Sequence, residues 1–236
     1  MAAVTLLEAR GLTRHFDGLK AVNGVDFDLV EGEIHALIGP NGAGKTTFVS
    51  LLSGRIPVQS GTIRLRGRDI TRLPAHARVR AGIAYTFQIT QIYGALSVFD
   101  NVALAAQSRH SHRLTEDAME ALARVGLDDR AAQEAGTLSY GHQRLLEVAM
   151  GLALKPQLLI LDEPTQGLAR GEIETFKEIV RSVVPEATVL LIEHNMDVVM
   201  DLAQRITVLN FGEVLATGTP EAIRANAAVQ TAYLGG

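Results

Sequence analysis

Short apolar runs bounded by turn residues divide the first third of the chain into predicted strands. Apolar and polar residues alternate at 25–29, which is the period-two pattern of a half-buried strand. Similar short runs occupy residues 6–10 and 62–65, next to turn signals at Gly11 and at Ser60-Gly61. These segments predict a small antiparallel sheet that packs beside a larger core.

The central part of the chain alternates between buried strands and helices. Residues 158–161 form a continuous apolar run, as expected for a strand that is covered on both faces. Buried strands are also predicted at 33–38 and 188–192, and 83–87 forms a fourth predicted core strand. Helices are predicted at 46–52, 141–154 and 172–183, the last with an apolar stripe formed by Ile173, Phe176, Ile179, Val180 and Val183. The alternation predicts an α/β fold with a mostly parallel sheet flanked by helices.

A helical stretch interrupts this alternation after residue 88. Ser97, with Asp100 three residues later, predicts a capped helix start, and Thr115 predicts the start of another helix that ends before Gly126. We therefore expect one domain over residues 1–236. Its expected parts are a core with the antiparallel β subdomain at about 1–87 and 145–218, a helical insertion at about 88–144, and a helical tail at 219–236.

Composition narrows the class of protein. With 47% hydrophobic and 20% charged residues, the 236-residue chain has the balance of a globular protein with a real core. A net charge of −4 argues against nucleic acid as a partner, and zero cysteines exclude disulfides and thiolate chemistry. We expect no membrane span, because the best apolar run, at 145–154, is short and contains Glu147.

Candidate chemistry begins at a glycine-rich loop between a predicted strand and a predicted helix. The pattern G-x-x-x-x-G-K-[ST] is filled by Gly39, Pro40, Asn41, Gly42, Ala43, Gly44, Lys45 and Thr46, and Thr47 follows. Glycines let successive N–H groups converge on phosphate oxygens, and the helix start favours the same anion. Lys45 would reach the outer phosphates and the Thr46 hydroxyl would bind magnesium. The loop predicts a nucleoside triphosphate site.

Two carboxylates follow the apolar strand at 158–161. Carboxyl ends of strands are where open α/β sheets bind ligands. Asp162 is placed to hold the magnesium shell, and Glu163 to act as general base toward water. Without the phosphate loop, a helix cap or a solvated turn would be the commoner explanation for this pair. Together with the loop, the pair predicts hydrolysis.

At these residues the chain resembles the ATP-binding cassette (ABC) family, the cytoplasmic ATPases of ABC transporters, over essentially its whole length. Residues 138–142, Leu-Ser-Tyr-Gly-His, stand where that family carries its LSGGQ signature. Further matches to the family pattern are Gln88 at the Q-loop, residues 163–168 near the D-loop, His194 after a strand, and Phe16 near the N-terminus.

The resemblance implies a shared site that takes ATP and Mg²⁺. Ser139 and Gly141 would face the γ-phosphate bound by a second ATPase subunit, so the active form would be a dimer. Gln88 would meet magnesium or the attacking water, His194 would orient Glu163, and Phe16 would stack on adenine. Departures from the family pattern are Tyr140 for glycine, His142 for glutamine, and Ala169 for the D-loop aspartate. They leave the effect on the dimer contact open.

A finer resemblance is to the ATPases of branched-chain amino acid importers, carried by residues 87–88, 97–102, 193–200, 209–220 and 232–236. It implies membrane permease subunits as partners, an indirect solute-binding protein, no nucleic acid, and a peripheral position on the cytoplasmic face of the membrane. An exporter or lipid-extraction ATPase remains an alternative. A non-transport ABC protein acting on DNA or ribosomes is disfavoured by the single cassette and the lack of basic bias.

Overall fold

The computed structural model describes residues 4–86, 91–108, 113–184 and 186–234. Gln88, and the predicted end of the core strand at 87, lie outside these residues. Across the described residues, every helix falls short of the length and apolar content that a membrane span requires.

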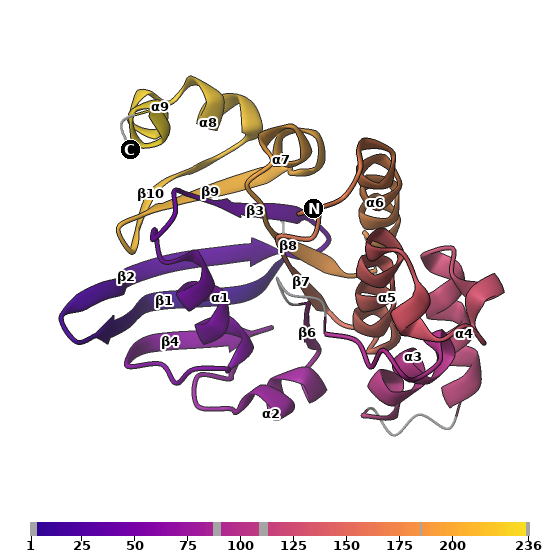
Figure 1. Ribbon diagram of the computed structural model, residues 1–236. Coiled ribbons are helices and arrows are strands. Elements are labelled where there is room, and N and C mark those ends of the chain that lie inside the picture. The colour runs from indigo at the N-terminus through magenta and orange to yellow at the C-terminus, as the bar shows by residue number, and fades with distance from the viewer. Residues whose placement is uncertain (1–3, 87–90, 109–112, 185, 235–236) are drawn as a thin grey trace.

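A six-stranded sheet forms the centre of the molecule (Figure 1). Its order is β10-β9-β3-β8-β7-β6, and every neighbouring pair except β9 and the edge strand β10 is parallel. The strands are β3 (Ile34–Ile38), β6 (Ile83–Tyr85), β7 (Leu158–Asp162), β8 (Thr188–Ile192), β9 (Arg205–Asn210) and β10 (Glu213–Gly218). β3, β7 and β8 are buried along their whole length, which confirms the prediction of strands covered on both faces.

The expected antiparallel sheet is present, with longer strands than the sequence indicated. It has the order β2-β1-β4-β5, with β1 (Thr5–Phe16), β2 (Leu19–Val30), β4 (Ser60–Leu65) and β5 (Arg68–Asp69). Gly11 is not the turn that we expected, because β1 runs through it. Its φ of 58° accompanies a register shift between Ala9 and Leu12, so the glycine forms a bulge inside the strand.

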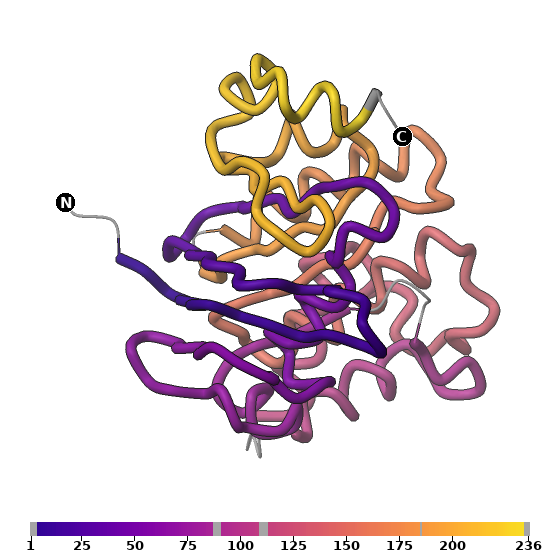
Figure 2. Tube along the Cα trace, turned by 90° about the vertical axis from the view of Figure 1, so that its left-hand side faces the viewer, coloured from indigo at the N-terminus to yellow at the C-terminus, as the bar shows by residue number. Residues whose placement is uncertain are grey.

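Helices cover both faces of the central sheet, and Figure 1 places the packed group α3, α4 and α5 at one side of it. Those three are α3 (Val98–Gln107), α4 (Leu114–Arg124) and α5 (Tyr140–Ala153). The others are α1 (Lys45–Ser53), α2 (Ala75–Arg80), α6 (Arg170–Val183), α7 (Met196–Leu202), α8 (Pro220–Ala225) and α9 (Ala227–Leu234). Figure 2 shows α8 and α9 above the end of the six-stranded sheet that carries β9 and β10.

Two predicted helix starts have different outcomes. Ser97 caps α3, because its Oγ accepts a hydrogen bond from the Asp100 N–H at 3.0 Å. The reciprocal half of the capping box is altered, since the Asp100 carboxylate accepts from the Ser97 hydroxyl at 2.6 Å. Thr115 does not cap α4, which begins one residue earlier without a side-chain cap. Glu116 and Asp117 in the first turn supply favourable charge at that end of the helix instead.

Helix α1 packs between the two sheets and joins their cores. The Phe48 ring of α1 meets the Phe27 ring of β2 edge-on, with the ring centres 5.2 Å apart. Both rings belong to one apolar cluster that also contains the side chains on one face of β7 and β8. On the other face, Phe176, Ile179, Val180 and Val183 of α6 are buried, as the stripe predicted, whereas Ile173 is only partly buried against the same core. The antiparallel sheet is therefore fixed to the core that carries the glycine-rich loop.

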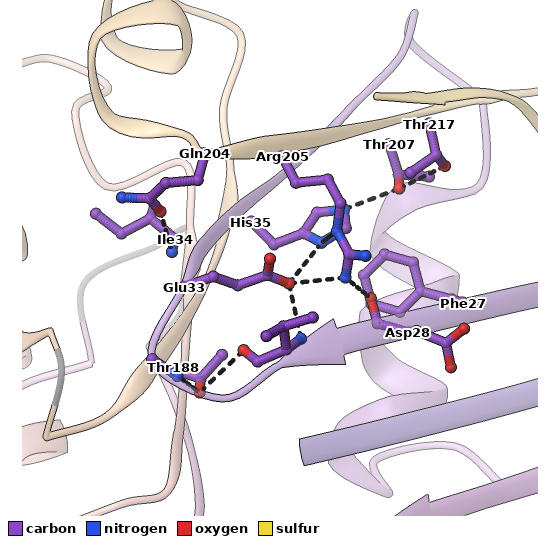
Figure 3. Close-up of polar contacts among 12 residues, drawn as sticks. Phe27, Asp28, Glu33, Ile34, His35, Thr188, Gln204, Arg205, Thr207 and Thr217 are labelled. Carbon is purple, nitrogen blue, oxygen red and sulfur yellow. Dashed lines mark hydrogen bonds and ion pairs between the residues drawn. The ribbon is translucent and has the colours of Figure 1, made fainter. Parts of the chain in front are cut away.

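A buried polar network also ties the two sheets together (Figure 3). His35 on β3 is 1% exposed, and its Nε2 lies 2.8 Å from the Thr207 hydroxyl. Arg205 donates from Nε to His35 Nδ1 at 3.1 Å. Its Nη2 donates to Glu33 at 2.8 Å and to the backbone carbonyl of Asp28 on β2. Burial lowers the pKa of His35, with Glu33 opposing and Arg205 reinforcing the effect. Nδ1 of His35 also lies 3.2 Å from Oε1 of Glu33, and burial favours the neutral form of the ring.

This network predicts an acid-sensitive contribution to stability. Below the ordinary His35 pKa of 6.5 the unfolded chain takes up a proton that the folded chain resists. The free energy of unfolding should therefore fall as the pH drops from about 6.5, by up to about 1.4 kcal/mol per pH unit. Glu33, whose pKa is lowered from 4.5, loses its contribution only at more acidic pH.

Urea denaturation of the wild type and of His35→Gln between pH 7.5 and 5.5 measures this contribution. The variant should lose less stability over that range, because its amide cannot take up the proton. Every other histidine is common to both proteins, so the difference isolates His35. Parallel stability curves would contradict the assignment.

Candidate functional site

The glycine-rich loop connects the end of β3 to the start of α1 and has no room for side chains at its two ends. Gly39 has a φ of 153° and Gly44 a φ of 98°. A Cβ at Gly39 would collide with the carbonyl oxygen of Leu209, and one at Gly44 with that of Ala21. Gly212 donates to the Ala43 carbonyl at 3.0 Å, so the β9–β10 turn also supports the loop. Only glycine allows this close backbone approach.

The start of α1 presents backbone N–H groups in a form that suits an anion. Its N-cap is Gly44, and no described side chain caps it. The unsatisfied N–H groups and the positive end of the helix dipole attract negative charge. Lys45 is buried and donates from Nζ to the carbonyls of Gly39 at 2.6 Å and Pro40 at 3.0 Å. Burial lowers its pKa, while Glu163 and Asp162 oppose that shift.

Three adjacent parallel strands, β6, β7 and β8, end in polar residues at the same edge of the sheet as this loop. Asp162 ends β7 and accepts a hydrogen bond from the Tyr85 hydroxyl at the end of β6. Burial raises the pKa of Asp162, whereas the Tyr85 hydrogen bond and the charges of Arg55 and Lys45 oppose that rise. Burial and Asp162 also raise the pKa of Tyr85, so its hydroxyl remains a donor.

Glu163 and His194 contact each other directly. Nε2 of His194 lies 2.8 Å from Oε1 of Glu163, so the structure brings together two residues that are 31 positions apart in sequence (194 minus 163). Glu163 has a φ of 48°, which is unusual for a residue with a side chain and costs about 1 kcal/mol or more. Its N–H donates to the Ile192 carbonyl of β8 at 2.8 Å, which holds it in that conformation. Such strain is typical of functional sites.

Glu193 organises the same region, although the sequence analysis missed it. Its buried carboxylate accepts from the backbone N–H groups of Thr165 at 3.0 Å, His194 at 2.8 Å and Asn195 at 3.0 Å, and from the Thr165 hydroxyl. It therefore joins the loop after β7 to the loop after β8. The signal that could have found it is the one that found Asp162, a carboxylate directly after a buried apolar strand.

The residues of the signature segment lie on a different element, at the start of α5. Ser139 is the N-cap of this helix, with its Oγ accepting from the His142 N–H at 3.3 Å. Gly141 faces the carboxylate of Glu172 on α6, which a Cβ would strike. Tyr140 accepts from Arg144 Nε at 3.2 Å and packs against Gly167. Neither Ser139 nor Gly141 belongs to the β3–α1 loop.

The remaining candidates have separate outcomes. Phe16 ends β1 and is 40% exposed rather than core, with the Arg14 guanidinium 4.8 Å from its ring centre. Thr46 is exposed and Thr47 partly buried in the first turn of α1. Gln88 lies outside the described residues. Ala169 is the N-cap of α6, and its N–H donates to Glu172 at 2.8 Å.

These residues fit a magnesium nucleotide. The two crowded glycines and the uncapped start of α1 form a backbone cradle for phosphate, and Lys45 supplies a buried cation beside it. Thr46 and Asp162 supply oxygen donors, the type of ligand that Mg²⁺ takes alongside phosphates and water. The donor set and the cradle therefore support ATP and Mg²⁺ in the same site.

Comparison with known proteins gives the family. A profile described as ABC transporter matches residues 22–166, more than half of the chain. The chain belongs to the ABC transporter family. A second profile, described as branched-chain amino acid ATP-binding cassette transporter, matches residues 213–236 of this ABC cassette.

Curated relatives match the ABC cassette along nearly its whole length. The high-affinity branched-chain amino acid transport ATP-binding protein BraF of Pseudomonas aeruginosa is 42% identical, with 98% of each chain covered. The corresponding protein LivG of Escherichia coli is 39% identical at the same coverage. A ribose import ATP-binding protein of Rubrobacter xylanophilus is 36% identical over 93% of this chain and 45% of its own length.

Solved structures agree with the fold. The ADP conformation of MJ1267, an ATP-binding cassette of an ABC transporter, superposes with a TM-score of 0.89 at 25% identity, covering 98% of this chain and 99% of that one. The predicted α/β fold, with its antiparallel sheet and inserted helices, is confirmed.

The hydrogen bonds of Glu193 predict a large loss of stability on truncation. Glu193→Ala removes the acceptor for four donors in a buried position. We expect the free energy of unfolding to fall by about 2–3 kcal/mol, measured by urea denaturation. Glu178→Ala, on the exposed surface of α6, is the matched control and should change it by less than about 0.5 kcal/mol. Equal effects of the two substitutions would show that Glu193 does not organise the site.

Proposed function

We propose that this ABC cassette hydrolyses ATP and thereby drives the uptake of branched-chain amino acids, or of a related polar solute, through a separate membrane permease. The contact between Glu163 and His194 supports the hydrolytic part, because a carboxylate held by a histidine suits a general base and the charge of Glu163 reaches Lys45 in the glycine-rich loop. The relatives that are 39–42% identical over 98% of the chain support the transport part.

The chain's own residues would hold the nucleotide and its metal as follows. Residues 39–47 surround the phosphates with N–H groups, and Lys45 neutralises charge on the outer phosphates. Thr46 and Asp162 hold Mg²⁺, with Gln88 as a further ligand. Phe16 stacks on the adenine ring at the exposed end of β1. ATP with Mg²⁺ supplies the phosphoanhydride bond whose cleavage drives transport.

Hydrolysis requires a base that is aimed at a water molecule. Glu163 accepts the proton of that water as general base, while its strained backbone and His194 fix the direction of its carboxylate. Glu193 fixes the backbone on both sides of this pair. Hydrolysis therefore depends on two loops that one buried carboxylate joins.

A second cassette completes the site in this proposal. Ser139 and Gly141 lie on α5, outside the β3–α1 loop of their own chain, and the start of α5 is an anion-binding element. Two cassettes would each contribute this helix start to the γ-phosphate held by the other. The helices within residues 88–144 would contact the permease on the cytoplasmic face of the membrane, and a solute-binding protein would act from the opposite side.

The ribose import relative favours a second solute class, because 93% of this chain aligns with part of a protein named for sugar import. The nucleotide site does not contact the transported solute, so its residues do not distinguish amino-acid transport from sugar transport. The proposal of amino-acid transport depends on the higher identity and the full coverage of the first relatives.

Transport and hydrolysis are tested together in vesicles. The cassette is purified from membranes with the permease that accompanies it and reconstituted with ATP on the cassette side and the solute-binding protein on the opposite side. We expect ATP-dependent uptake of leucine, isoleucine or valine, and no uptake of ribose. Glu163→Gln should lower both ATP turnover and uptake by at least about 100-fold while ATP still binds, since only the base is lost.

Three results would contradict the proposal. Near wild-type turnover of Glu163→Gln would remove this residue as the base. Uptake of ribose alone would replace the solute. Recovery of ribosomal or DNA-repair proteins in place of a permease would remove transport altogether.

The dimer is tested by a substitution that keeps the helix cap and changes the charge. Aspartate caps helices as well as serine does, so Ser139→Asp should leave the folding stability unchanged. Its carboxylate would repel the partner's γ-phosphate. In a Glu163→Gln background, which retains ATP, we expect Ser139→Asp to raise the dimer dissociation constant at least about tenfold, which is 1.4 kcal/mol. Light scattering during size-exclusion chromatography measures it, and an unchanged ATP-dependent dimer would contradict the role of Ser139.

A further inference from the structure

Tyr85 contacts the magnesium carboxylate of the proposed site from a neighbouring strand. It is the last residue of β6 and pairs with Ile160 of β7, so Asp162 lies two residues further along the partner strand. That offset is about 6–7 Å, which a long side chain can span. The Tyr85 hydroxyl does so and donates to Oδ2 of Asp162.

A donor such as the Tyr85 hydroxyl on one carboxylate oxygen has a directional effect. Asp162 is only 4% exposed, so few solvent contacts compete to orient it. With Oδ2 held by Tyr85, the plane of the carboxylate is fixed and Oδ1 is left for the metal and its water shell. Partners that hydrogen-bond metal ligands in this way commonly set both ligand orientation and metal affinity.

Arg55 fixes Tyr85 in turn. Helix α1 ends at Ser53. Its C-cap Gly54, with a φ of 75°, turns the chain away, and the Arg55 guanidinium then lies 4.9 Å from the centre of the Tyr85 ring. A cation over the face of an aromatic ring stabilises that ring position. Helix α1 thus begins at the phosphate cradle, and the chain just after its end carries Arg55, which supports Asp162 through Tyr85.

We propose that Tyr85, held by Arg55, is a positioning residue that orients Asp162 toward Mg²⁺. The proposal rests on the proposed magnesium role of Asp162. Tyr85 is not a ligand in it, because its hydroxyl is directed at the carboxylate.

The test separates metal-dependent from metal-independent nucleotide binding in Tyr85→Phe, which loses only the hydroxyl. Binding of a fluorescent ADP analogue is measured with Mg²⁺ and, separately, with EDTA. We expect the dissociation constant with Mg²⁺ to rise about tenfold and that with EDTA to stay unchanged. Tyr93→Phe is the matched control, since Tyr93 is 61% exposed, and it should change neither value. Thermal unfolding without nucleotide verifies that each variant is folded.

Arg55 gives a second, independent variant should Tyr85→Phe fail to fold. Arg55→Met keeps the stem and removes the cation, so it should raise the dissociation constant with Mg²⁺ by about threefold and leave that with EDTA unchanged. Arg55→Lys, which restores a cation, should recover part of the loss.

The results of these experiments distinguish failure of the Tyr85 role from failure of the proposed magnesium site. If the wild type binds nucleotide more tightly with Mg²⁺ and Tyr85→Phe behaves like it, only the role of Tyr85 is overturned. Equal weakening with Mg²⁺ and with EDTA also overturns it, because a merely structural residue would act on both. If the wild type itself shows no Mg²⁺ dependence, the magnesium role of Asp162 fails and the role of Tyr85 fails with it.

Discussion

The candidate site depends on the parallel alignment of β3, β6, β7 and β8, because it sends four chain segments to one edge of the sheet. Each of these strands contributes a different kind of group there. β3 supplies the glycine-rich loop, β7 the pair of carboxylates, β8 the Glu193–His194 segment, and β6 the hydroxyl of Tyr85. An antiparallel neighbour would have sent its polar end to the opposite edge. The buried strands are thus as much a requirement of the chemistry as of the core.

Concentrating polar groups at a buried edge has an electrostatic cost, and the fold offsets it with local partners. Lys45 and Asp162 are almost fully buried. Burial lowers the pKa of Lys45 and raises that of Asp162, so it favours the neutral form of each side chain. Backbone carbonyls of the loop accept from Lys45, and Tyr85 donates to Asp162. The two charges also stabilise each other. A site held in this way is preorganised, because its charged side chains already have fixed orientations before any ligand binds.

The sequence predicted the groups whose position follows from their own strand. Asp162 and Glu163 follow an apolar run, and the glycine pattern of the loop requires no knowledge of the rest of the chain. Tyr85 and Arg55 escaped prediction because their contacts depend on the register between β6 and β7 and on the direction in which the chain leaves α1. The error at Gly11 has a related cause, since a glycine with positive φ marks a bulge as readily as a turn.

Helix α5 is connected to the chain segment that follows β6 by charge as well as by packing. Arg144 and Glu147 on α5 form an ion pair at 3.1 Å that is almost completely buried. Glu147 also accepts from the backbone N–H of Gln91 at 2.7 Å, and Arg144 donates to Tyr140 beside the signature serine. Removing one member of a buried ion pair leaves the other charge unpaired and lowers the free energy of unfolding by about 3–5 kcal/mol. The start of α5 and the chain at Gln91 are therefore joined through one buried charged network, and substitution of either Arg144 or Glu147 would disturb both.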